Sequence, residues 1–159
     1  MKSINSTKIA LIGYLIITMI NGSLLLHSDT TKQLFLFGNI LVFVGYLLLS
    51  KEYYEELNKD HKKKSEEFSK GHLILFILYL GNYFMPINPS PHNFDLIILA
   101  SHLLLIKHNE YSYIGYIGSF IYYSLLIHHY SSEEGSTMNY IKMFAYLLLV
   151  YYNYTHIKL

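Results

Sequence analysis

Six apolar stretches, separated by polar or turn-forming segments, follow one another along the chain. They cover residues 9–26, 34–50, 73–87, 94–106, 111–128 and 138–156. The first and the last have about the 17–20 residues that a helix needs to cross a hydrocarbon core of roughly 30 Å, and the second and the fifth come close to that length. The pattern therefore predicts an all-α, polytopic membrane helical bundle with about six transmembrane segments, forming a single domain over residues 1–159.

The third and fourth stretches are shorter than the other four. Residues 73–87 and 94–106 offer only about 15 and 13 apolar positions, a length at which a re-entrant hairpin competes with two separate crossings. Gly45 and Gly115, and Gly38 one heptad before Gly45, predict close packing between helices, because small residues let backbones approach one another. Both models of the region 73–106 remain open at this point.

The lysines provide a test of the six-span model that is independent of hydropathy. Six crossings put ten of the twelve lysines on one side of the membrane, together with both chain ends and residues 51–70. Only Lys32 and Lys142 then lie on the opposite side. An excess of basic residues on one side is the usual signature of membrane orientation, so the charge distribution supports this topology.

Residues 51–70 form a charged block with six Lys and six Asp or Glu residues. Its apolar positions recur at helical spacing, and Glu55 lies four residues before Lys59 as a favourable ion pair. We therefore predict a charged helical extension of the second segment. Tyr54, Leu57 and Phe68 are its candidate residues for docking a partner protein, and the alternative is a solvated hinge.

Composition excludes several classes of chemistry. Only 14% of the residues are charged, the net charge is +1, and the chain has no Cys and no Arg. Disulfides, iron–sulfur clusters, cysteine zinc sites and thiol nucleophiles are therefore impossible, and no basic patch indicates nucleic acid. We see no nucleophile–base pair or acid–base pair either, so we expect no catalytic residues and no enzyme activity.

Nine histidines raise the question of haem or metal binding. His102 lies near the middle of the fourth stretch, whereas His72 falls at the start of the third, where an imidazole would reach water. A haem held by two histidines needs both at one depth on facing helices, and no partner for His102 can be named from the sequence. We therefore expect no resident cofactor and no metal, and a structural role for His102.

The proline-rich turn at residues 85–95 carries a family resemblance. Its tripeptide Ser90-Pro91-His92, followed by apolar segments, resembles the ubiquinone-side motif of the larger membrane-anchor subunit of succinate dehydrogenase. The match covers three residues, and the arginine and tyrosine that the family places around them are missing. The resemblance implies a quinone contact at Ser90, with His92 and His102 as further cofactor-binding candidates.

Polar residues inside the apolar stretches are few. Asn39, Asn82 and His102, with the deep tyrosines, would line the pocket of a small carrier, although asparagines more often bond between helices. Asp95 and Lys142 lie near segment ends, where they can cap a helix or reach the interface. The deep tyrosines, whose hydroxyls need partners in adjoining helices, subunits or lipids, are Tyr116, Tyr122 and Tyr146.

These observations favour a non-catalytic accessory subunit of a large multi-subunit membrane complex, whose partners are other membrane subunits and lipids. The composition and the early start of the first apolar stretch point to a respiratory-chain or ATP synthase complex of the mitochondrial inner membrane. The alternative membranes are the endoplasmic reticulum and other cellular membranes. The alternative functions are a small-molecule transporter or carrier and a quinone- or haem-binding membrane anchor.

Overall fold

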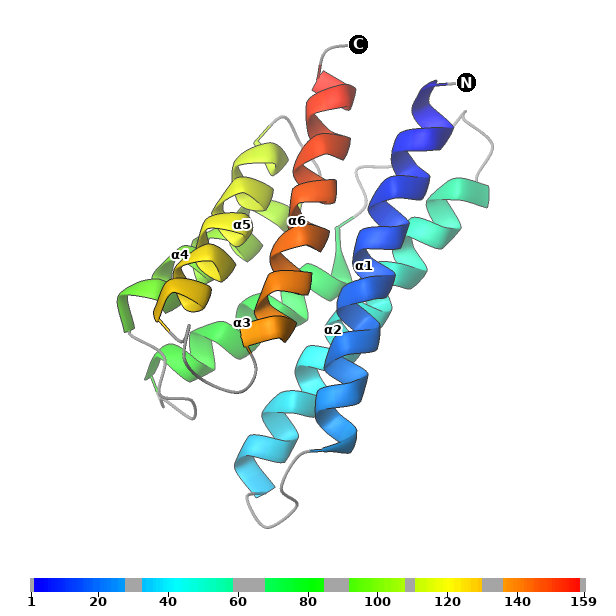
Figure 1. The fold of residues 1–159 in the computed structure, drawn as a ribbon. Coiled ribbons are helices and arrows are strands. Elements are labelled where there is room, and N and C mark those ends of the chain that lie inside the picture. Colours follow the sequence, from blue (N-terminus) through cyan, green and yellow to red (C-terminus); the bar gives the residue numbers. More distant parts are fainter. Residues whose placement is uncertain are drawn as a thin grey trace.

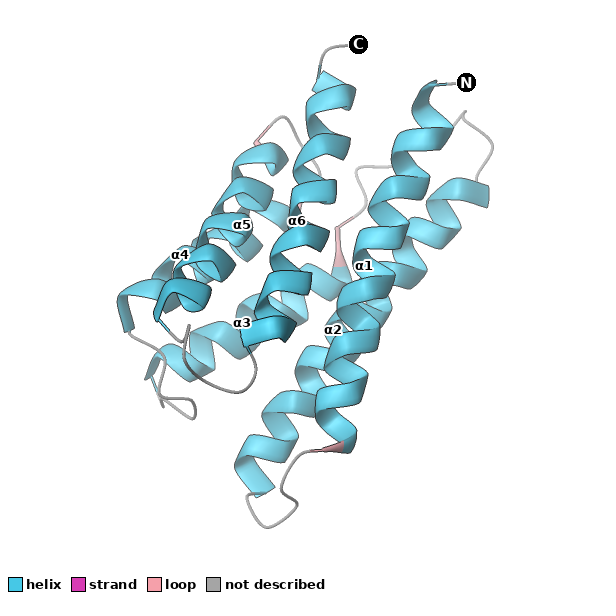
Figure 2. Cartoon of the chain, in the orientation of Figure 1, coloured by secondary structure: helices cyan, strands magenta, loops and turns pink. Residues whose placement is uncertain are grey.

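The computed structural model describes residues 2–27, 33–58, 68–84, 92–107, 111–129 and 136–157, and nearly all of them are helical (Figure 2). In chain order the helices are α1 (Lys2–Leu26), α2 (Gln33–Asn58), α3 (Lys70–Phe84), α4 (His92–Leu105), α5 (Ser112–His129) and α6 (Ser136–Ile157). Each predicted apolar stretch coincides with one helix to within a few residues, apart from the longer polar ends of α1 and α2. The all-α class is confirmed for the described residues.

The six helices close into a ring. Each helix packs against the one before it and the one after it in the chain, and α6 packs against α1 (Figure 1). No other pair of helices comes close in the parts of the chain that the structure describes. The first turn of α1 and the last turns of α2 and α6 lie at one end of the ring, which we call the terminal end (Figure 1). This is the arrangement that six alternating helices produce.

Glycines let α2 and α3 approach closely. A Cβ atom added at Gly71 would lie only 2.5 Å from Leu49 Cγ and 2.8 Å from the carbonyl oxygen of Gly45. The same addition at Gly115 would meet the backbone of α4 at 2.7 Å. The close packing predicted for Gly45 and Gly115 is confirmed, because only a residue without a side chain fits there. Gly38 is different, since nothing lies within 4 Å of its added Cβ.

The charged extension of α2 is helical as far as Asn58, which confirms the prediction for residues 51–58. Residues 59–67 lie outside the described residues. Phe68 is not part of this helix, because it forms an isolated antiparallel bridge with Lys107 just before α3 begins.

The prediction that Phe68 shares one helical face with Tyr54 and Leu57 is therefore wrong. A helical period cannot continue through a residue whose backbone is in a bridge. Tyr54 and Phe68 are exposed, and Leu57 is half-buried.

The start of α3 is fixed by hydrogen bonds to its neighbours. Ser69 Oγ accepts from the backbone N–H of His72 at 3.3 Å, as a helix N-cap does. The same hydroxyl donates to Glu52 of α2 at 2.7 Å, and Glu52 also accepts from the backbone N–H of Gly71 at 3.1 Å. The backbone N–H of Ser69 donates to the carbonyl oxygen of Ile106 at 2.8 Å. The first turn of α3 is thus held between α2 and the end of α4.

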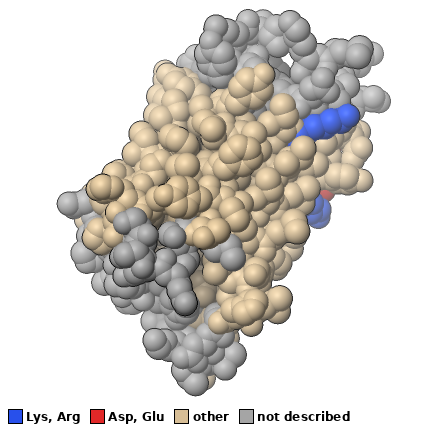
Figure 3. Space-filling view, in the orientation of Figure 1, with Lys and Arg blue, Asp and Glu red and all other residues tan. Residues whose placement is uncertain are grey.

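Large apolar side chains are exposed on all six helices, and several polar side chains are buried inside the ring together with apolar ones. Met19 is 73% exposed and Phe144 is 53% exposed, but Asp95 is only 1% exposed. In Figure 3 the visible described surface is almost free of charged residues. The exposed apolar side chains of the helices include Ile12, Leu15, Phe37, Leu47, Ile77, Phe84, Leu96, Leu103, Ile114, Ile117, Ile121, Ile141 and Leu147.

Among the described residues, two helices are long and apolar enough to cross a membrane, through the stretches Lys8–Leu26 and Leu36–Glu55. The apolar part of α4, Phe94–Leu105, is shorter. Helix α3 has 15 residues and α4 has 14, which correspond to about 22 and 21 Å at a rise of 1.5 Å per residue. Both are shorter than a hydrocarbon core of roughly 30 Å.

Candidate functional site

Two histidines meet inside the ring at the pairing of α3 and α4. His72 Nδ1 lies 3.1 Å from His102 Nδ1, and the two ring centroids are 5.3 Å apart. His72 is 1% exposed and His102 is fully buried. The inference that His72 reaches water and that His102 has no partner at its depth is therefore wrong. The N-cap of α3 holds His72 three residues after Ser69, inside the ring instead of at its surface.

Tyrosine hydroxyls extend this pair across the ring. Tyr14 Oη lies 3.0 Å from His72 Nε2 and donates to Tyr116 Oη, also at 3.0 Å. Tyr116 Oη is in turn 2.7 Å from Tyr53 Oη. We call His102, His72, Tyr14, Tyr116 and Tyr53 the histidine–tyrosine chain. It joins α4, α3, α1, α5 and α2, and most of its bonds connect helices that do not pack side by side.

The hydrogen bonds determine where the protons of two neutral imidazoles lie. Tyr14 uses its only proton to donate to Tyr116, so its oxygen must accept from His72 Nε2. The Nδ1 atom of His72 is then an acceptor, and His102 must carry its proton on Nδ1. His102 Nε2 keeps a lone pair, and among the described residues it is the buried side-chain nitrogen or oxygen without a hydrogen-bond partner.

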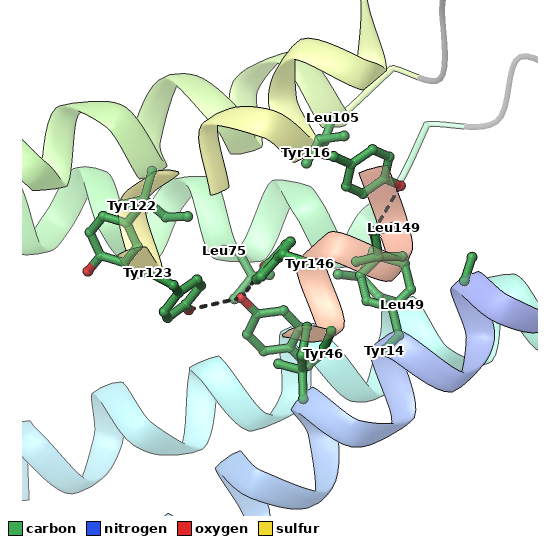
Figure 4. Packing of buried hydrophobic residues seen from close by; sticks show 14 of the residues in the cluster. Tyr14, Tyr46, Leu49, Leu75, Leu105, Tyr116, Tyr122, Tyr123, Tyr146 and Leu149 are labelled. Atoms are coloured by element: carbon green, nitrogen blue, oxygen red, sulfur yellow. Dashed lines mark hydrogen bonds between the residues drawn. The ribbon is translucent and has the colours of Figure 1, made fainter. Parts of the chain in front are cut away.

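A second group of hydroxyls, which we call the tyrosine cluster, consists of Tyr46, Tyr79, Tyr123 and Tyr146. Tyr46 Oη lies 2.5 Å from Tyr146 Oη and 3.5 Å from Tyr123 Oη (Figure 4). Tyr79 hydrogen-bonds Tyr123, and the ring of Tyr79 stacks on His102 at 5.4 Å with an angle of 14°. This stack connects the cluster with the histidine–tyrosine chain. Together the two groups draw hydroxyls or imidazoles from all six helices.

Ionisable side chains lie beside the tyrosine cluster. Lys142 Nζ is 5.6 Å from the centroid of the Tyr123 ring, a cation–π distance, and the residue is 9% exposed. Asp95, in the first turn of α4, accepts from Asn82 Nδ2 of α3 at 3.2 Å. Asp95 thus lies where the helix dipole favours a carboxylate, but α4 begins three residues earlier, at His92, so Asp95 is not the N-cap residue that was predicted. Lys142 does not reach the surface, so its predicted interfacial position is wrong.

The other polar residues singled out in the sequence have simpler roles. Asn21 Nδ2 donates to the carbonyl oxygen of Ile17 in its own helix at 2.8 Å, and only Asn82 makes the predicted bond between helices. Asn39 is half-buried and takes no part in the two hydroxyl groups. Asn82 is bonded to Asp95 beside the tyrosine cluster, and the carrier pocket predicted from Asn39, Asn82 and His102 stays a prediction.

The quinone candidates receive no test. Ser90 lies outside the described residues, and His92 begins α4 without a described side chain. His102 is described, and its geometry bears on haem binding. A haem held by two histidines needs a nitrogen from each on opposite faces of the porphyrin, but here the facing nitrogens of His72 and His102 are 3.1 Å apart and bonded to each other. The pair does not fit a bis-histidine haem.

A protein metal site is not assembled from the described side chains either, since no three His, Asp or Glu residues gather within them. The histidine–tyrosine chain and the tyrosine cluster, with the neighbouring Lys142, therefore form a polar axis inside the ring. The groups of this polar axis bond mainly to one another. Sequence reasoning missed His72, Tyr14 and Lys142 as members of this axis. The sequence did contain one signal for these residues, the number of hydroxyls and imidazoles inside the apolar stretches. Such groups must find hydrogen-bond partners within the bundle.

Comparison with known proteins identifies no relative: no family model, no curated protein and no solved structure matches the chain. Function must therefore be argued from the residues and their geometry.

Proposed function

We propose that this chain spans a membrane with its six helices, the short α3 and α4 crossing where the bilayer thins around them, and that it serves as a non-catalytic accessory subunit of a larger membrane complex. The observation that carries the proposal is the large apolar surface of the ring, together with the polar groups buried inside it. Hydroxyls, imidazoles, Asp95 and Lys142 point inward, whereas the outward positions on all six helices are occupied mainly by large apolar side chains. A soluble monomer rarely exposes apolar surface of this extent, but a lipid environment favours it.

The subunit role is supported by how the interior is filled. Tyr14, Tyr46, Tyr116 and Tyr146 are fully buried, and their hydroxyls bond to other side chains of the same ring. Such an interior holds the helices together and leaves the outer faces for interactions. The leading setting is an energy-converting complex of the mitochondrial inner membrane, a respiratory-chain or ATP synthase complex, for which the composition is the support.

Purification in mild detergent, followed by mass spectrometry of co-migrating polypeptides, tests the subunit role. Tyr54→Ser combined with Leu57→Ser should release the chain from its partners if the end of α2 docks another subunit, because burying such side chains contributes roughly 1.5–3 kcal/mol each. Lys51→Met is the matched control, since exposed ion pairs such as Lys51–Glu55 contribute at most about 1 kcal/mol. Purification of the wild-type chain alone, with no partner in any detergent, would contradict the subunit role.

A carrier that moves protons or small polar molecules is the second candidate, and a specific observation favours it. Lys142 and Asp95 are both buried beside the tyrosine cluster, and ionisable groups at membrane depth are often part of transport paths. Reconstituted vesicles with an internal pH dye should then show a proton leak that Lys142→Met abolishes. Lys70→Met, which removes an exposed lysine outside the ring, is the control. Equal leaks from vesicles with and without the protein would exclude proton transport.

A further inference from the structure

An apolar groove runs along the outer surface between α1 and α2. It has a volume of about 480 Å³, within the range of ligand-binding clefts. Four leucines line most of it: Leu11 and Leu15 from α1, and Leu47 and Leu48 from α2. No part of the polar axis described above enters this groove. Its lining is therefore suited to a hydrocarbon chain.

The groove changes character at its end nearer the terminal end of the ring. There the lining continues with Ser50, Lys51 and Tyr54. Lys51 Nζ lies 3.8 Å from Glu55 Oε1, and the two side chains are 69% and 53% exposed. A positive and a negative group therefore stand side by side next to the apolar groove, with the 60% exposed ring of Tyr54 beside them.

We propose that this groove binds one acyl chain of a zwitterionic phospholipid, a phosphatidylethanolamine or phosphatidylcholine, whose phosphate lies at Lys51 and whose amine lies at Glu55. The proposal rests on the membrane placement proposed above. Lys51 and Glu55 end the apolar stretch Leu36–Glu55, so in a membrane they lie at the depth of the headgroups, whereas the leucines lie at the depth of the acyl chains.

The order of the two charges matches the order of groups in such a lipid. Glu55 is four residues beyond Lys51, about 6 Å further from the apolar stretch at 1.5 Å per residue. In a phospholipid the phosphate is likewise attached nearer to the acyl chains, and the amine lies further out. An anionic lipid such as phosphatidylglycerol carries its charge on the same phosphate but has no cationic group to place at Glu55, so the pair favours the zwitterionic lipid, whose amine Glu55 attracts.

Tyr54 adds a contact suited to the same headgroup. Its ring projects beside the charge pair and can contact the amine or quaternary ammonium through its π face. A helix of a partner subunit is the competing occupant of this groove. Such a helix would need to match a mixed charge pair at the end of an apolar contact, whereas a zwitterionic lipid supplies both the hydrocarbon and the two charges in one molecule.

Native mass spectrometry of the full chain tests the proposal, after reconstitution with equal amounts of phosphatidylethanolamine and phosphatidylglycerol and gentle detergent exchange. We expect one retained phosphatidylethanolamine per chain. Lys51→Met should weaken retention by roughly two- to fivefold, as expected for an exposed charge contact, and Lys70→Met should leave it unchanged. Glu55→Gln should shift the preference toward phosphatidylglycerol, because it removes the carboxylate that attracts the amine of phosphatidylethanolamine.

Three outcomes would overturn the proposal. Equal retention of both lipids by the wild-type chain and by Glu55→Gln would show that the headgroup is not recognised. Retention that falls as much in Lys70→Met as in Lys51→Met would show a non-specific effect of charge. A cross-link from position 15 to a co-purifying polypeptide would assign the groove to a subunit. Release of the chain from membranes by alkaline carbonate would instead contradict the membrane placement itself, so the two failures can be told apart.

Discussion

Removal of the Tyr14 hydroxyl tests the histidine–tyrosine chain most directly. Tyr14 is fully buried, and its oxygen connects His72 of α3 with Tyr116 of α5. Neither of these helices packs against α1, so the hydroxyl joins parts of the ring that backbone packing leaves apart. Tyr14→Phe keeps the aromatic ring, which lies 4.9 Å from the ring of Tyr53, and removes only the oxygen. Any loss of stability therefore reports on the hydrogen bonds.

The size of the effect follows from the two bonds that are lost. Side-chain hydrogen bonds between membrane helices contribute about 0.6 kcal/mol each on average, so the two bonds of Tyr14 account for about 1.2 kcal/mol. The N–H at His72 Nε2 also loses the acceptor that Tyr14 provides in a buried environment, which adds a cost of about 1–3 kcal/mol. We expect Tyr14→Phe to lower the free energy of unfolding by about 2–4 kcal/mol, with the loss at the imidazole as the larger contribution.

Reversible unfolding in mixed micelles, titrated with sodium dodecyl sulfate and followed by near-ultraviolet circular dichroism, measures this change. Tyr113→Phe is the matched control, because Tyr113 is 39% exposed on the outer face of α5 and should lose less than about 0.5 kcal/mol. A double-mutant cycle with His72→Phe should show coupling, since both substitutions remove the same bond. If Tyr14→Phe and Tyr113→Phe have equal effects, the hydroxyl bonds do not stabilise the ring and the reasoning fails.

Three further predictions concern the tautomers, the helix contact and the topology. Nitrogen NMR of ¹⁵N-histidine-labelled protein should find His72 protonated on Nε2 and His102 on Nδ1; the reverse pattern in either ring would contradict the proton order of the chain. Gly71→Ala should destabilise the fold by about 1–3 kcal/mol in the same unfolding assay, because its Cβ would overlap a leucine of α2, and an unchanged midpoint would contradict the close contact. Cysteines introduced at Ser3 and Asn58 should react with an impermeant reagent from the same side of the membrane, and labelling from opposite sides would contradict the six-span arrangement.

Hydropathy predicted the number and positions of the helices well, because each apolar stretch is bounded by residues that favour water. It predicted their ends less well. Helix α1 begins at Lys2, seven residues before its apolar stretch, since polar residues can continue a helix wherever it has a neighbour to pack on. The length of an apolar stretch indicates how much of a helix fits in the hydrocarbon core of a membrane. Hydrogen bonding instead determines the residue at which the helix ends.

The meeting of His72 and His102 could not be predicted from the sequence. Because His72 follows the charged block closely in the sequence, the pattern predicts that it lies at the surface. Its burial depends on Glu52, which accepts from Ser69 and draws the first turn of α3 against α2. The two histidines are 30 residues apart, and their contact is set by the offset between α3 and α4. That offset is a tertiary property, and no local pattern of apolar and polar residues specifies it.

The deep tyrosines show which side chains determine how the helices are oriented in the ring. Their need for partners could be predicted, and Tyr116 and Tyr146 indeed bond to Tyr14 and Tyr46 across the ring. Which partner each finds depends on how every helix is rotated about its own axis. In the membrane setting proposed above, a leucine gains almost nothing by facing another helix instead of an acyl chain, so apolar residues do not set that rotation. Hydroxyls and imidazoles do, because lipid offers them no partner and the interior of the ring does. In that setting the polar residues that hydropathy counts as interruptions select one set of helix rotations, and with it which side chains face outward.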